Sequence, residues 1–77
     1  MTLTIYTEDF DEKDAISDGL CGDVFIDGAE KRFYRGTLSQ NLSDALKCSL
    51  EENIDINEIV ICYRSKNEQR FRRFSVN

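Results

Sequence analysis

The chain has 77 residues, a formal net charge of −5, five Phe and three Tyr, and it contains no His, Trp or Pro. A chain of this length is expected to form a single compact domain over residues 1–77 that buries only about 60% of its unfolded surface. Such a small core leaves no room for the deep cleft of enzymes that act on small molecules. The lack of His also removes the commonest general base and metal ligand.

The first half of the chain carries patterns typical of β-structure. In Thr2–Thr7, leucine and isoleucine alternate with threonine and tyrosine, which is the period-two pattern of a strand. Residues 23–26 and 32–35 predict a hairpin around the turn Asp27-Gly28, because glycine accepts the positive φ that such turns require. We therefore expect three strands before the first long helix.

An acidic segment, residues 8–22, separates the first two predicted strands. One interpretation is a short helix that begins at Asp11 and ends at Gly19, because aspartate caps helices well and further acids would lie near the positive N-terminus. The other interpretation is a plain loop. Either structure places the segment at one end of the sheet.

The clearest periodic pattern predicts an amphipathic helix over Thr37–Asn53. Thr37, with Gln40 three residues later, fits a capping box, while Ser39 and Asn41 are rival N-caps. The asparagine at the end of the pattern can take the left-handed conformation that terminates helices. At about 100° per residue, one stripe is expected to cover the sheet: Leu38, Leu42, Ala45, Leu46 and Ser49, with Leu50 at its margin.

Two further strands are predicted after the helix. The continuous apolar run Ile59–Tyr63 suits a strand covered on both faces, and the helical crossover before it predicts parallel pairing with Thr2–Thr7. Arg70–Val76 is predicted to return as an antiparallel edge strand whose arginines discourage unwanted pairing. The predicted fold class is α+β, a small five-stranded mixed sheet (βββαββ along the chain) with one amphipathic helix packed on one face.

Charge divides the chain into an acidic first part and a basic second part. Residues 1–30 carry nine acids and one base, a net of −8, and residues 31–77 carry nine bases and six acids, a net of +3. One interpretation is that this division only keeps the chain soluble. The functional interpretation is that the acidic part binds a protein, because clustered carboxylates attract a basic partner. The candidate protein-binding residues are Glu8, Asp9, Asp11, Glu12, Asp14, Asp18 and Asp23.

The last strand is a candidate nucleic-acid contact. Aromatic and basic residues interleave in it, as they do in surfaces that bind a phosphate backbone and stack on bases. The residues concerned are Arg70, Arg72 and Arg73. Because the whole chain is acidic, we expect a protein partner in preference to nucleic acid.

The other chemistry-bearing residues predict no catalytic, cofactor or metal site. The acidic run from Asp9 fails as a calcium loop, because Lys13 and Asp14 stand where an oxygen ligand and a glycine are needed. The three cysteines, at 21, 48 and 62, do not make a disulfide framework, and the N-terminus has no export signal, so we expect a cytoplasmic protein. No apolar run approaches the roughly 20 residues of a membrane span.

Part of the chain resembles the first half of a ribonuclease H-like domain. The resemblance consists of LTIYTED, a hairpin, LSQNLSDALKCSLEE and IVICYRSK, in that order. Family membership implies carboxylates that hold two metal ions at the end of the first strand, in the helix and after the next strand. Glu8 or Asp9 matches the first position and Asp44 the second, but Arg64 occupies the third. The resemblance therefore implies a degenerate fold of this type, without activity.

Together these features predict a small, non-enzymatic protein-binding module. The hypothesis is an inhibitor that docks its acidic N-terminal segment on a partner with a basic or nucleic-acid-binding surface. Phage and mobile-element anti-defence proteins of the anti-CRISPR type, immunity proteins and antitoxins are such inhibitors. One alternative is a nucleic-acid-binding accessory protein that uses the basic C-terminal strand, and the other is the degenerate ribonuclease H-like fold without activity. The sequence also leaves a homodimer as an alternative, because Phe71, Phe74 and Val76 make the last strand partly apolar.

Overall fold

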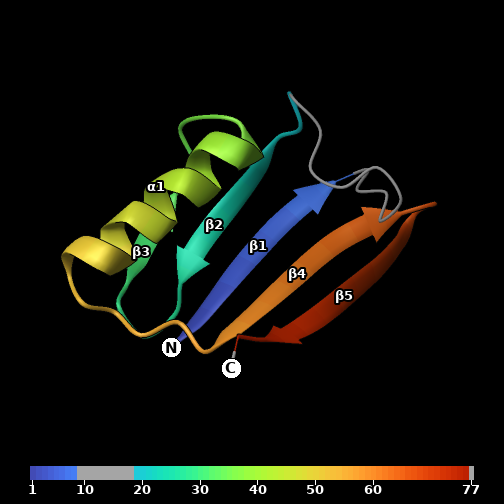
Figure 1. Cartoon of the computed structure of the whole chain (residues 1–77). Helices are drawn as coiled ribbons and strands as arrows, with labels where there is room; N and C mark the ends of the chain where they lie inside the picture. The colour runs from blue at the N-terminus through green and yellow to red at the C-terminus, as the bar shows by residue number, and fades with distance from the viewer. Residues whose placement is uncertain (9–18, 77) are drawn as a thin grey trace.

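The computed structural model describes residues 1–8 and 19–76, and these form a five-stranded mixed sheet with one helix (Figure 1). This confirms the predicted α+β class and the order βββαββ. The predicted alternatives for residues 9–18, a short helix or a loop, lie outside the described residues. The elements are β1 (Thr2–Glu8), β2 (Gly22–Ile26), β3 (Lys31–Phe33), α1 (Leu38–Glu51), β4 (Glu58–Ser65) and β5 (Glu68–Ser75).

The strands lie in the order β3-β2-β1-β4-β5. β1 and β4 are parallel, with Leu3 beside Ile59, while the other neighbouring pairs are antiparallel. The prediction that the strand after the helix lies beside the first strand is therefore confirmed, as is the antiparallel edge strand at the C-terminal end. β1 is the middle strand and joins the N-terminal hairpin to the C-terminal hairpin (Figure 1).

Helix α1 begins and ends as its sequence predicts. The Thr37 Oγ1 accepts a hydrogen bond from the backbone N–H of Gln40 at 3.2 Å, which satisfies one of the free donors of the first turn. At the other end Asn53 has a φ of 54°, and the N–H of Ile54 donates to the Ser49 carbonyl at 2.9 Å. This is the Schellman arrangement, in which the left-handed residue turns the chain back over the last helical turn.

The predicted core stripe of the helix is partly wrong, because α1 is rotated from the expected position. Leu38, Ala45 and Ser49 are buried as expected, but Asn41 is also buried, with 1% of its surface exposed. Leu46 and Leu50 are 44% and 80% exposed. The buried asparagine fixes this rotation through its hydrogen bonds.

The side-chain amide of Asn41 makes three hydrogen bonds to two parts of the backbone. Its Nδ2 donates to the carbonyls of Gly22 at 2.7 Å and Gly36 at 3.1 Å, and its Oδ1 accepts from the N–H of Gly36 at 3.0 Å. The helix can approach because position 22 is glycine. A Cβ there would lie 2.8 Å from the Tyr6 carbonyl oxygen and 3.0 Å from the Leu38 Cδ1. These contacts hold the first turns of α1 against the start of β2.

The expectation that β4 is covered on both faces is wrong. Helix α1 packs over β2 and β3, so it leaves the β4 and β5 side of the sheet open (Figure 1). In β4 only Tyr63 is buried, at 5% exposure, and the other residues are half-buried or exposed. β4 is an internal strand in its hydrogen bonding but lies outside the main core, which is formed by Leu3, Ile5, Val24, Ile26, Leu38 and Ala45.

Replacing Asn41 with alanine is expected to lower the free energy of unfolding by about 2–3 kcal/mol, because three buried hydrogen bonds are lost and backbone groups lose a partner. Urea unfolding followed by circular dichroism measures the change. Leu50→Ala is the control in the same helix, and it should change the free energy by less than about 0.5 kcal/mol because Leu50 is exposed. Equal stability of the two variants would contradict the bridging role of Asn41.

Candidate protein-binding surfaces

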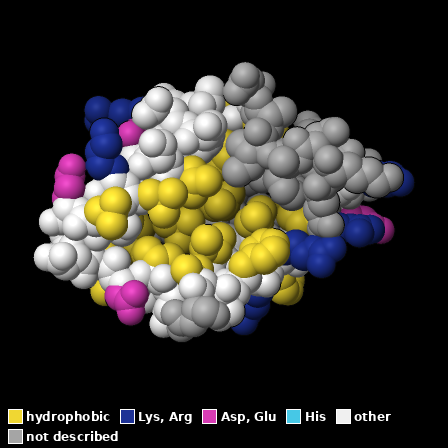
Figure 2. All heavy atoms as spheres, in the orientation of Figure 1, with side chains coloured by type: hydrophobic (Ala, Val, Ile, Leu, Met, Phe, Trp, Pro, Cys, Tyr) yellow, Lys and Arg dark blue, Asp and Glu magenta, His cyan; other side chains and the backbone are white. Residues whose placement is uncertain are grey.

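Apolar side chains on the helix side of the sheet, between α1 and β5, remain exposed or only partly buried against the core. Figure 2 shows them as a continuous yellow region in the middle of this face. Ile59 and Ile61 belong to it, because they pair with the core residues Leu3 and Ile5 and so point to the same side. We call this surface the open apolar face, and its members are Leu42, Leu46, Leu50, Ile59, Ile61 and Phe74.

The three leucines lie on the flank of α1 that is turned toward this open side. Asp44 marks the opposite flank, because it lines a small hollow together with Arg32 and Phe33 of β3. Leu46 lies two residues further on, about 200° around the helix axis from Asp44. Leu42 and Leu50 are one turn before and after Leu46, so the three form one row. The open apolar face therefore runs from this row on α1 across β4 to Phe74 of β5.

Because this surface is exposed, the free energy that burial of its side chains would contribute is not gained in the free chain. Leu50 is 80% exposed, Phe74 50% and Leu46 44%. Full burial of one such side chain is worth about 1.5–3 kcal/mol. Single exposed leucines are common on protein surfaces, but adjoining apolar residues from a helix and two strands are typical of an interaction site.

The edge strand β5 borders the open apolar face and carries the predicted nucleic-acid residues. All eight of its residues are exposed. Its register divides the arginines between the two faces of the sheet: Arg70 and Arg72 pair with Tyr63 and Ile61 on the helix side, whereas Arg73 pairs with Val60 on the far side. The structure therefore does not bring the three arginines together on one face.

Two of the seven predicted protein-binding acids are described, and the structure places both near the start of β2. Glu8 ends β1 and Asp23 lies in β2. The other five lie outside the described residues: Asp9, Asp11, Glu12, Asp14 and Asp18. The Asp23 carboxylate already has a partner in this chain, because it forms an ion pair with Arg32 at 2.8 Å.

An aromatic and basic cluster on the far face was not predicted. The Arg32 guanidinium lies 4.5 Å from the ring centre of Tyr34 and 5.5 Å from that of Phe25, and Tyr6 packs edge-on against Phe25. The pairing of Phe25 with Arg32 across the hairpin could have indicated this contact, since directly paired residues share a face. The Arg32 guanidinium therefore makes its stacking contacts and its ion pair with Asp23 inside this chain, and the cluster stabilises the edge of the sheet at β3.

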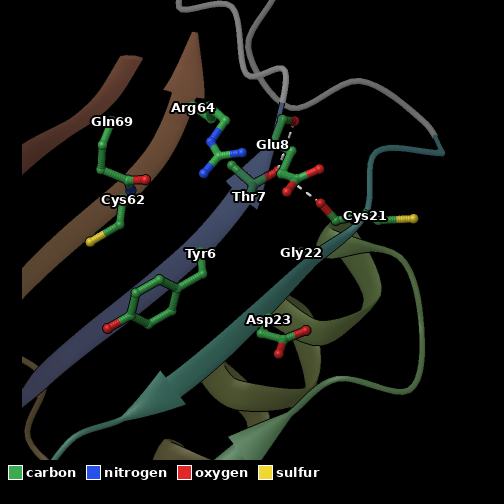
Figure 3. A pocket seen from close by; sticks show the side chains of 9 residues that line it. All are labelled: Tyr6, Thr7, Glu8, Cys21, Gly22, Asp23, Cys62, Arg64 and Gln69. Carbon is green, nitrogen blue, oxygen red and sulfur yellow. Dashed lines mark hydrogen bonds between the residues drawn. The ribbon is translucent and has the colours of Figure 1, made fainter. Parts of the chain in front are cut away.

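The far face also contains a shallow hollow of about 400 Å³ at the carboxyl end of β1 (Figure 3). Tyr6, Cys62 and Gln69 line its sheet floor, and Glu8 and Arg64 lie at the end where β1 and β4 finish. The register places Glu8 beside Arg64, so the acid and the cation are neighbours. The hollow is open and lined by both polar and apolar groups, and it lies on the opposite side of the sheet from α1 (Figure 3).

The metal-binding arrangement implied by the ribonuclease H-like resemblance is not assembled in the described residues. Glu8 lies on the far side of the sheet, whereas Asp44 is on the helix that covers the other side. Arg64 stands beside Glu8 where a further carboxylate would be needed. Within residues 1–8 and 19–76, no group of three or more His, Cys, Asp or Glu side chains is placed to hold a metal ion.

All three cysteines are free thiols in the structure. The Cys48 thiol donates a hydrogen bond to the Glu52 carboxylate at 2.8 Å, and Lys31 pairs with the same carboxylate at 3.3 Å. The hydrogen bond to Glu52 raises the pKa of the Cys48 thiol, and burial adds to this effect. The same bond, with Lys31, lowers the pKa of Glu52. Cys48 is therefore held in its less reactive, protonated form.

Comparison of the chain with protein-family models, with curated proteins and with solved structures found no match. None of the helices in the described ranges is long and apolar enough to cross a membrane. The surfaces described above are therefore the basis for a functional proposal.

At pH 8, Cys48 is expected to react with Ellman's reagent more slowly than the exposed Cys21, because its raised pKa leaves less thiolate. Variants that retain one cysteine each allow the two rates to be measured separately. Glu52→Gln should increase the Cys48 rate several-fold, because it removes the carboxylate charge that opposes thiolate formation. Glu51→Gln is the matched control and should have a smaller effect, since Glu51 contributes the least to the shift. Equal effects would contradict the assigned contact.

Proposed function

We propose that this protein is a non-enzymatic protein-binding module that binds its partner through the open apolar face. The observation that carries the proposal is the off-centre position of α1, which leaves apolar residues of the helix and β5 exposed and those of β4 only partly buried (Figure 2). Covering such a surface is favourable and non-directional, and it is the main source of affinity in most protein–protein association. The partner would complete the layer that α1 begins.

The dimensions of the fold support this proposal. Neighbouring strands lie about 4.8 Å apart, and a helix with its side chains is about 10 Å wide. One helix therefore covers about two strands, and here it packs over β2 and β3. Beyond β1, the remaining width of a five-stranded sheet is about that of one more packed element. A partner can supply that element without any rearrangement of the core.

The charge of the chain supports a role as an inhibitor of a basic partner. The net charge is −5, and nine of the fifteen acids lie in residues 1–30. Long-range attraction of this kind raises the association rate more than the final affinity. We propose that the acidic segment guides a partner with a basic or nucleic-acid-binding surface, and that the open apolar face then holds it. Phage anti-defence proteins, immunity proteins and antitoxins are the classes of inhibitor that fit this description.

The double variant Leu46→Gln/Leu50→Gln is expected to weaken partner binding about 100-fold, because two leucines at about 1.5 kcal/mol each contribute about 3 kcal/mol. The partner is first identified by affinity capture and mass spectrometry, and its affinity for each variant is then measured by calorimetry. Stability should change by less than about 1 kcal/mol, since both leucines are exposed.

The matched control, Lys47→Gln/Glu51→Gln, alters two exposed residues on the outer surface of the same helix and should keep the wild-type affinity. Unchanged binding by the leucine variant would contradict the use of the open apolar face.

Reversing Asp11, Glu12 and Asp14 to lysine is expected to lower the association rate at least about tenfold at low salt, with little change in the dissociation rate. Surface plasmon resonance with the identified partner measures both rates. The control reverses three acids outside that segment, each exposed in the structure, and it should have a smaller effect: Glu30, Glu51 and Asp55. If both triple variants slow association equally, the net charge matters and the acidic segment has no special role.

A further inference from the structure

β5 is an open edge of the sheet. It has eight residues, all exposed, whereas the opposite edge strand β3 has only three. One side of β5 pairs with β4, so alternate N–H and C=O groups along its other side point away from the sheet. A long edge of this kind is a template for another strand, and proteins normally protect it.

The arginines of β5 protect it against pairing with a second copy of the same strand. In a two-fold antiparallel pair of sheets, facing residues lie on the same face of the joined sheet. A pair centred on Phe71 places Arg70 opposite Arg72 of the second copy, and a pair centred on Arg72 or Arg73 places that arginine opposite itself. Like charges directly opposite one another are destabilising. A pair centred on Phe74 avoids this but uses only the end of β5.

The same arginines favour a strand of opposite charge. Arg70 and Arg72 are two residues apart on the helix side, and Arg73 lies on the far side. On an added strand, alternate residues would lie beside Arg70 and Arg72, where carboxylates would form cross-strand ion pairs. Arg70 at present pairs with Glu68 at 3.0 Å, an exposed contact of low net stability that a partner carboxylate can replace.

We propose that β5 binds an extended acidic segment of a partner protein as a sixth strand of the sheet. Backbone hydrogen bonds along the edge would supply affinity, and Arg70 and Arg72 would select carboxylates on the helix-side face. Phe74 is on that same face and belongs to the open apolar face, so a partner strand at β5 is continuous with the surface of the proposed function. The inference rests on that function, because it names the chemistry of the segment that the partner presents.

The test uses three capped eight-residue peptides and the full chain. The first peptide alternates glutamate with valine, the second has lysine in place of glutamate, and the third is the first with alternate amides N-methylated. Binding is followed by NMR titration and by amide hydrogen exchange of β5. The glutamate peptide is expected to bind at least tenfold more tightly than the lysine peptide and to slow exchange at alternate residues of β5. The N-methylated peptide should not bind, since it cannot donate the edge hydrogen bonds.

Arg70→Glu/Arg72→Glu should reverse this preference and bind the lysine peptide more tightly. The matched control, Arg35→Glu/Lys47→Glu, makes the same change in net charge at exposed residues outside β5 and should retain the preference for glutamate. Equal binding of the N-methylated peptide, equal binding of the two charged peptides, or no binding of any peptide would overturn the proposal. If sedimentation equilibrium shows a dimer and the β5 amides of that dimer are protected from exchange, the edge strand pairs with a second copy of the chain and the proposal is rejected.

Different results would reject the two proposals, the protein-binding face and strand addition at β5. If the identified partner is lost by Leu46→Gln/Leu50→Gln but retained by Arg70→Glu/Arg72→Glu, the protein-binding module stands and strand addition at β5 is rejected. If the arginine variant loses the partner and the leucine variant keeps it, the open apolar face is rejected as the main contact. Loss in both variants supports one continuous surface.

Discussion

The position of α1 on the sheet depends on one buried amide, that of Asn41. Its hydrogen bonds to Gly22 and Gly36 leave no freedom to rotate the helix, because each buried polar group left unpaired costs about 1–3 kcal/mol. Leu38 and Ala45 therefore face the core, and the row of leucines that includes Leu46 and Leu50 faces outward. A polar contact at one end of the helix thus determines which apolar side chains stay available for a partner.

The sequence predicts most of the fold because its signals are local. Alternation marks β1, the Thr37 cap marks the start of α1, and Asn53 marks its end. The exact rotation of the helix does not follow from such signals. A 3.6-residue period assigns Leu46 and Leu50 to an apolar stripe, but the period is the same whether that stripe meets the core of the same chain or a second protein. The burial of Asn41 is equally difficult to predict from the sequence, because asparagine in a helix normally faces solvent.

The candidate surfaces were harder to predict because they depend on strand register. In the sequence, Arg70, Arg72 and Arg73 form one basic group, yet the register separates them onto two faces. The pairing of Arg32 with Phe25 likewise follows from the hairpin register and not from composition. A change of one residue in register moves every side chain of a strand to the other face. The number of charged and apolar residues can therefore be counted from a sequence. Which of them share a surface can be determined only once the strand pairing is known.

The arrangement of β4 and β5 also affects how the molecule opens. The main core lies under α1, whereas β5 packs mainly against β4. Regions with few buried apolar contacts detach at a lower free energy than the whole domain unfolds. We therefore expect β5, and β4 to a lesser degree, to open at a lower free energy than the main core, to which β4 is attached through the parallel ladder with β1. A partner bound across the helix and these strands would raise the free energy of this opening, so the complex would unfold more cooperatively than the free chain.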